Sequence, residues 1–141
     1  MSWSIVLMVC INALAQKSIP WVDSKGHIHY NNKEIGTLTA VAGLDKSGHP
    51  TTKIDNSGNV IDSTGNIIGR APKNNTFEYY MNDKAQTFSI GTADHSGLCE
   101  VKNDKGKVIL LLHQGYKAQA ACAIHCLYDN HCMSSQMEHV Q

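Results

Sequence analysis

A four-residue turn signal recurs six times along this chain and constrains its fold more than any other feature. Each copy begins with aspartate or asparagine and ends with glycine. The copies are Asp23–Gly26, Asp45–Gly48, Asp55–Gly58, Asp62–Gly65, Asp94–Gly97 and Asn103–Gly106. In such turns the first side chain accepts hydrogen bonds from the turn's own amides, and glycine adopts the left-handed conformation that closes the turn. Each copy therefore predicts two short antiparallel strands that meet at a tip.

The segments between the turns have the pattern of short strands. Apolar and polar residues alternate over a few positions, as in His27–Tyr30 and Thr37–Val41. Isoleucine is followed by glycine where one hairpin should pass to the next, at Gly36, Gly69 and Gly91. Glycine within a strand marks a bend or a close approach of backbones. Between residues 72 and 83 no glycine turn occurs, and Asn82-Asp83 is the alternative there.

The last third of the chain breaks this rhythm. Val108–Leu112 is an apolar run without alternation, typical of a strand buried on both faces or of the beginning of a buried helix. Residues 116–128 then have a helical pattern, and from Ala120 to Leu127 small and apolar residues occupy nearly every face. A helix that is apolar all round is buried all round. We therefore predict a mainly β fold, with short antiparallel hairpins arranged radially as a shallow barrel around one buried C-terminal helix.

This combination resembles the bacterial β-flower proteins. The features that carry the resemblance are the six turns, the glycines at 36, 69 and 91, and the apolar run from Val108 through Leu127. In that family of small exported proteins, hairpin petals form a shallow barrel around a C-terminal hydrophobic helix. The resemblance covers residues 21–132. The family is in turn distantly similar to tubby-type barrels, some of which bind lipid. It implies an architecture, and a fold-level likeness carries no function with it.

The first fifteen residues, MSWSIVLMVCINALA, have the pattern of a signal peptide. They carry no charge, and their apolar run ends in Ala13-Leu14-Ala15, the small-x-small pattern that a signal peptidase accepts. A membrane anchor needs about 20 apolar residues, so an integral membrane protein is not expected. Alternatives are a buried first strand or helix, and a lipoprotein signal that uses Cys10. We predict a signal peptide at 1–15, a lead-in at 16–20, one domain at 21–132, a flexible tail at 133–141, and an exported protein, periplasmic or extracellular.

Charge and composition exclude several classes of function. Twelve basic residues balance twelve acidic ones, and the single arginine and the scattered lysines form no basic stripe for a phosphate backbone, so no nucleic-acid partner is expected. The chain has no G-x-S-x-G motif, and no nucleophile has an evident base, which argues against an enzyme and against a cofactor. We expect a non-catalytic binding or interaction module. Its partner would be a protein, a glycan or a lipid, with a lipid or a surface protein as the possible partners.

Four cysteines remain after removal of the predicted leader, an even count in a compartment where disulfides persist. They are Cys99, Cys122, Cys126 and Cys132, and all three pairings stay open. The alternative function is metal handling. Cys122 and Cys126 lie one helical turn apart with His125 adjacent, so together with Cys132 they could hold a soft metal such as zinc. Because the spacing matches no standard zinc motif, disulfides and buried thiols are the favoured explanation.

Two weaker metal hypotheses concern the strands and turns. His27 and His29 should point to one face of a strand, yet no third ligand is evident nearby. The turns at Asp55 and Asp62 offer several oxygens, but they lack the distal bidentate glutamate of a calcium loop. Exposed histidines and ordinary hairpin turns are the favoured interpretations.

Overall fold

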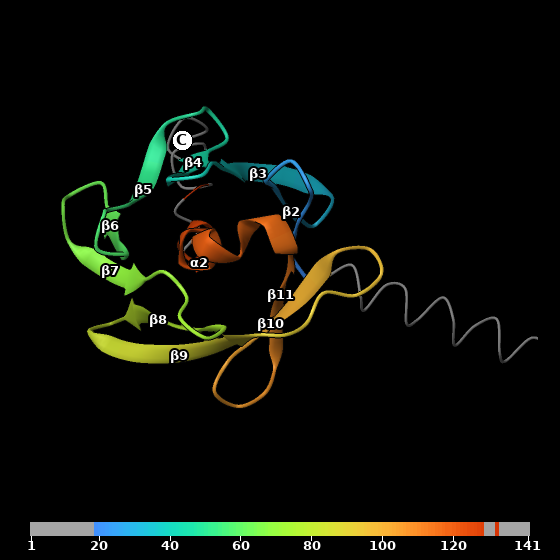
Figure 1. Cartoon of the computed structure of the whole chain (residues 1–141). Coiled ribbons are helices and arrows are strands. Elements are labelled where there is room, and N and C mark those ends of the chain that lie inside the picture. The colour runs from blue at the N-terminus through green and yellow to red at the C-terminus, as the bar shows by residue number, and fades with distance from the viewer. Residues whose placement is uncertain (1–18, 129–131, 133–141) are drawn as a thin grey trace, which may run out of the picture.

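The structure is a computed structural model that describes residues 19–128 and Cys132. In this part of the chain, eleven short strands form a closed barrel around one α-helix, α2 (Ala120–Leu127), as Figure 1 shows. The predicted fold class, short hairpins around a single C-terminal helix, is confirmed. The predicted signal peptide, most of the lead-in, the tail at 133–141 and His131 lie outside the described residues.

The strands follow one another around the barrel in chain order. They are β1 (Trp21–Val22), β2 (His27–Tyr30), β3 (Lys33–Leu38), β4 (Ala42–Asp45), β5 (Pro50–Ile54), β6 (Asn59–Asp62), β7 (Ile67–Arg70), β8 (Thr76–Met81), β9 (Lys84–Ile90), β10 (Leu98–Lys102) and β11 (Val108–His113). Each pairs antiparallel with the next, and the barrel closes between β1 and β11, where Trp21 faces Leu111 and Val22 faces Leu112. This closure is parallel because an odd number of alternating strands leaves the first and the last running in the same direction.

The six predicted turns are present. Their glycines all have positive φ, between 80° and 91°. In the turn that begins at Asp55, the Gly58 amide donates to the Asp55 carbonyl, and Asp55 Oδ1 accepts from the amides of Ser57 and Asn59 at 2.9 and 2.8 Å. The turn at Asp94 joins β9 and β10, which pair antiparallel at Ile90–Val101 and Ser89–Lys102.

Three further tight turns contain no glycine. They are formed by Asn31-Asn32, Asn74-Asn75 and Asn82-Asp83, all six residues with φ between 50° and 65°. Two consecutive residues with positive φ form the hairpin turn whose twist matches that of the strands, and Asn and Asp tolerate this conformation best after glycine. The alternative turn at Asn82-Asp83 is therefore confirmed, and it joins β8 to β9.

The predicted helix over 116–128 consists of two elements. A 3₁₀ helix, η1 (Gln114–Gln119), precedes α2, and Tyr116 within it has non-helical angles, φ −120° and ψ 22°. The Tyr116 ring packs against the turn at Gly26, where an added Cβ would lie 2.9 Å from it. The run at 108–112 is strand β11, and its burial alternates. Leu110 and Leu112 are fully buried, whereas Val108, Ile109 and Leu111 are half-buried.

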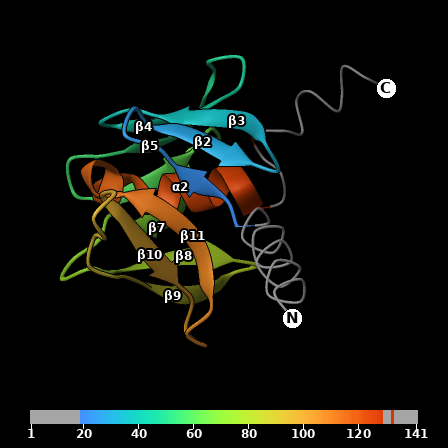
Figure 2. The same cartoon turned by 90° about the vertical axis from the view of Figure 1, so that its right-hand side faces the viewer.

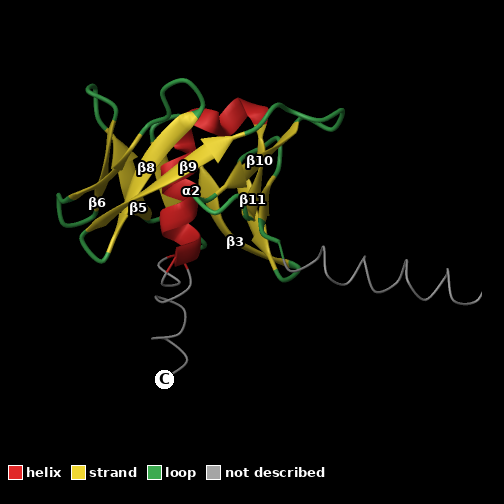
Figure 3. Cartoon of the chain, turned by 90° about the horizontal axis from the view of Figure 1, so that it is seen from below, coloured by secondary structure: helices red, strands yellow, loops and turns green. Residues whose placement is uncertain are grey.

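The core lies between α2 and the inner face of the barrel. Figure 3 shows the helix with β5 and β8 on one side and β3, β10 and β11 on the other, and in Figure 2 strands lie both above and below it. Ala120, Ala121, Cys122 and Ala123 have no exposed surface. The strands contribute fully or almost fully buried Val22, Ile28, Leu38, Val60, Val101, Leu110 and Leu112. The helix therefore supplies the centre of a core that strands of this length do not fill alone.

Candidate functional site

Three strand glycines allow α2 to lie close to the barrel wall. A Cβ added at Gly36 of β3 would lie 2.8 Å from Cys126 Sγ, and one at Gly43 of β4 would lie 3.2 Å from Cys122 Cβ. A Cβ at Gly69 of β7 would lie 3.4 Å from Ala121 Cβ. The predicted close approach is thus present at Gly36 and Gly69. At Gly91 the nearest atom to an added Cβ is a strand carbonyl oxygen at 3.6 Å, so that glycine is not pressed against the helix.

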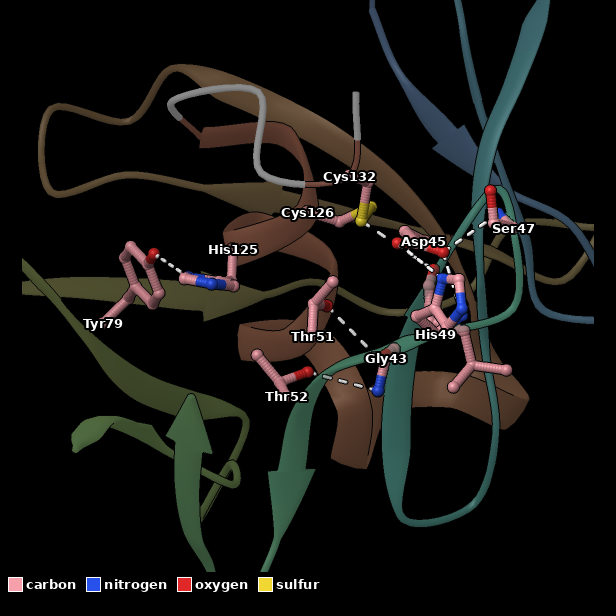
Figure 4. The surroundings of a disulfide bond; sticks show 11 residues. Gly43, Asp45, Ser47, His49, Thr51, Thr52, Tyr79, His125, Cys126 and Cys132 are labelled. Atoms are coloured by element: carbon pink, nitrogen blue, oxygen red, sulfur yellow. Dashed lines mark hydrogen bonds and ion pairs between the residues drawn. A yellow bond between two sulfur atoms is a disulfide. The ribbon is translucent and has the colours of Figure 1, made fainter. Parts of the chain in front are cut away.

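A disulfide fixes the C-terminal end of α2. Cys126, in the last turn of the helix, is bonded to Cys132, and both residues are fully buried. Figure 4 shows the bond beside β4, where Cys132 Sγ lies 3.8 Å from the Leu44 carbonyl oxygen. The sequence left three ways of pairing the four cysteines. In the structure Cys126 pairs with Cys132, and Cys99 and Cys122 are buried free thiols.

His125 projects from α2 in another direction, toward β8. Its Nδ1 lies 2.6 Å from the Tyr79 hydroxyl, and both residues are buried (Figure 4). This hydrogen bond satisfies two polar groups inside an apolar core, which avoids the cost of an unpaired buried group. It also ties the helix to the strand opposite the disulfide.

The two thiols are in low-dielectric surroundings. Burial raises the pKa of the Cys122 thiol to about 11, although a hydrogen bond with Thr52 acts in the opposite direction. Burial also raises the pKa of Cys99. Because the thiolate is the reactive and metal-binding form, both cysteines are poorly suited to redox chemistry near neutral pH.

The four predicted metal ligands are separated by these contacts. Cys126 and Cys132 are bonded to each other, Cys122 contacts Thr52 of β5, and His125 contacts Tyr79 of β8. Within residues 19–128 and Cys132, no three His, Cys, Asp or Glu residues are arranged to hold a metal ion. Metal binding by the predicted set would first require reduction of the disulfide.

The strand histidines each contact one carboxylate. His27 Nδ1 lies 2.8 Å from Glu34 Oε2, and His29 Nε2 lies 2.9 Å from Asp23 Oδ2. The His29 ring also stacks on Trp21, with ring centroids 4.4 Å apart. Desolvation of the Asp23 carboxyl is outweighed by its hydrogen bonds to His29 and to nearby amides, and its pKa is lowered. These contacts connect neighbouring strands on the outer surface of β1, β2 and β3.

The turn carboxylates are occupied by their own turns. Hydrogen bonds from the Leu98 and Ser96 amides lower the pKa of Asp94, and the amide of Asn59 is the largest cause of the lowered pKa of Asp55. Oxygens that accept amide hydrogens in this way are less available to a cation. The hairpin interpretation of these turns agrees with the hydrogen bonds.

A pocket of about 550 Å³ lies where α2 leaves the barrel and is here called the mouth pocket. Its described wall includes Ile124, Leu127 and Tyr128 at the end of the helix, with Ile19-Pro20 beside them. The remaining wall comes from the ends of β2 and β8, the first part of β9 and the β10–β11 hairpin. This volume is in the range of small-molecule sites, roughly 300–1,000 Å³.

β9 and β10 border the mouth pocket where their pairing ends. Their last paired position is Ser89–Lys102, at the end of β10, so β9 from Lys84 to Phe88 has no partner in β10. Phe88 and Ile109 contribute to the apolar wall, and its polar members are Gln86, Asn103 and Lys107 together with the hydroxyls of Tyr30 and Tyr128. Among the lining residues that the structure describes there is no carboxylate, cysteine or histidine.

Sequence reasoning missed this pocket because its wall comes from segments far apart in the chain. The one local signal is in β9, where Gln86, Phe88 and Ile90 alternate with exposed residues and face inward. Gln86 is an inward-facing polar residue in a strand whose other inward-facing residues are apolar. This indicates that the barrel interior is incompletely filled at that level.

No helix in residues 19–128 is both long and apolar enough to cross a membrane. No family model matches the chain, and comparison with curated proteins and with solved structures finds no match either.

Proposed function

We propose that this chain is an exported, non-catalytic binding module of β-flower-like architecture that holds a small apolar-bodied molecule in the mouth pocket. The mouth pocket carries the proposal, because a concave site of about 550 Å³ with a largely apolar wall is the usual form of a ligand site. Its described lining lacks the carboxylate, thiol and imidazole groups that perform most acid–base and nucleophilic catalysis, which favours binding.

Export is supported by two features. The small-x-small motif after the apolar leader favours cleavage before Gln16, and a buried disulfide is typical of an oxidising compartment. N-terminal sequencing of the protein from its native host should find Gln16 first, whereas retention of Met1 would contradict cleavage.

Uptake of Nile red, an uncharged dye that fluoresces in apolar surroundings, tests the binding site. We expect the full chain to increase its fluorescence, and Leu127→Trp to abolish most of the increase by filling the mouth pocket. Ile67→Trp is the matched control, because Ile67 is half exposed on β7 and lies outside the described lining. Circular dichroism of each variant checks folding, and Ile109→Trp fills the same pocket from another strand. Absence of uptake by the parent chain, or uptake by both pocket-filling variants equal to that of the parent, would contradict the proposal.

A further inference from the structure

The described lining of the mouth pocket combines apolar and polar side chains. Ile124 and Leu127 of α2 and Phe88 of β9 are among its apolar members. Besides the hydroxyls of Tyr30 and Tyr128, its polar members are Gln86 of β9 and Asn103 and Lys107 of the turn between β10 and β11. A ligand that satisfies both kinds of group must itself be amphipathic.

Two of the polar members, Asn103 and Lys107, lie together in the β10–β11 turn. That turn is closed by a hydrogen bond from the Asn103 amide to the Lys107 carbonyl, at 3.0 Å, which makes these two residues neighbours. Asn103 and Lys107 therefore form one polar locus at the hairpin turn.

This polar locus presents donors and positive charge. Asn103 Oδ1 already accepts from the amides of Lys105 and Lys107, at 3.0 and 2.9 Å, so what Asn103 offers a ligand is its amide N–H₂ group. Lys107 is the charged member of the described lining, and its ammonium only donates. A carboxylate only accepts and is negatively charged, so it complements both groups.

We infer that the ligand class of the mouth pocket is a free single-chain amphiphile with a carboxylate head, as in a fatty acid. This inference rests on the proposed binding function and specifies its ligand. Lys107 and Asn103 then determine head-group specificity, while the apolar wall supplies affinity that does not depend on the head.

Three probes with the same chain and different heads test this specificity. Isothermal titration below the micelle concentration should show that laurate binds more tightly than lauryl alcohol, and that dodecyltrimethylammonium binds least. Because Lys107 is exposed, Lys107→Gln should weaken laurate binding roughly two- to five-fold, as for an exposed ion pair, and leave the alcohol unchanged. Lys107→Glu should favour the cationic probe. Lys105→Gln is the matched control, because Lys105 is exposed in the same turn but lies outside the described lining.

The outcomes separate this inference from the function on which it rests. Failure of all three probes and of Nile red to bind would overturn the binding function itself. Equal affinity for the three heads, or an unchanged laurate affinity in Lys107→Gln, would overturn the carboxylate inference while the pocket still binds. Sedimentation with phosphatidylglycerol vesicles, without binding of free laurate, would also overturn it and would indicate a membrane surface instead.

Discussion

Single atoms set the distance between α2 and its wall. Gly36, Gly43 and Gly69 lie where an added Cβ would come within 2.5–2.7 Å of a strand oxygen as well as against the helix. Real Cβ atoms do not approach oxygen so closely, so a side chain there must displace a strand or the helix. On the helix side these glycines face alanine and cysteine. The side chains on both sides of the contact are therefore already small.

Replacing Gly36 by alanine tests this packing. The new methyl would lie 2.5 Å from the Leu44 carbonyl oxygen and 2.8 Å from Cys126 Sγ, and we expect a loss of about 1–3 kcal/mol in the free energy of unfolding, as for overpacked cores. Gly91→Ala is the matched control, because its methyl meets nothing closer than 3.6 Å. Urea unfolding measures both. Equal stability of the two variants would show that the barrel wall shifts to accommodate the added methyl group without loss of stability.

The sequence reveals such glycines unevenly. Gly36 and Gly69 follow isoleucine within a strand pattern, which signals close approach. Gly43 follows alanine in a stretch without clear alternation and carries no such signal, although it faces Cys122. Gly91 has the signal without the contact with the helix. Which glycine meets the helix depends on the register of distant strands.

At the level of elements, the hairpin turns form from local chemistry alone. Each carboxylate or amide at the first position accepts from amides two and four residues ahead, so all the required groups lie within five consecutive residues. This is why all six turns could be predicted from the sequence. The three turns without glycine use the same left-handed region, and of these only the one at Asn82-Asp83 is predicted from the sequence.

Acid should weaken these turns. Amide hydrogen bonds hold the pKa of Asp94 below 3.8, so its charged form stabilises the fold above that pH, and this contribution is lost as pH falls through the lowered value. Asp94→Asn keeps an acceptor, as Asn103 shows in the sixth turn, and removes the titration. We therefore expect the variant to lose less stability than the parent between about pH 7 and about pH 3. Urea midpoints at both pH values measure this, and identical losses would refute it.

Helix limits were harder to predict than turns. The small apolar residues of 120–127 indicate burial on all sides, and that part is α2. The residues before it were assigned to the same helix, but packing of the Tyr116 ring on the Gly26 turn accompanies a local break in helical geometry. That packing involves residues far apart in sequence, so helix propensity does not report it.

For the whole molecule, the barrel and its central helix are mutually dependent. Eleven strands of two to seven residues enclose a helix of eight, and four consecutive helix positions have no exposed surface. The sequence predicted this threading because small apolar residues surround the helix. The disulfide partner and the mouth pocket could not be predicted, because both depend on where the helix ends relative to the strands.

Scanning leucine through residues 120–123 tests the threading. Each substitution adds volume where the wall is already in contact, and we expect a loss of about 1–3 kcal/mol at every one of the four positions. Ala85→Leu on β9 is the control, because Ala85 is exposed. Thermal or urea unfolding measures the series. A position that accepts leucine without loss would mean that one side of the helix faces solvent.

The parallel closure between β1 and β11 has a consequence for how the fold is reached. Every other strand pair joins neighbours in the chain, and such local pairs form early at little entropic cost. The pairing of Trp21 with Leu111 must wait until nearly the whole barrel has emerged from the ribosome or a translocation channel, and α2 follows later still. Successive petals can therefore assemble one after another, yet each keeps its apolar face uncovered until the last element arrives.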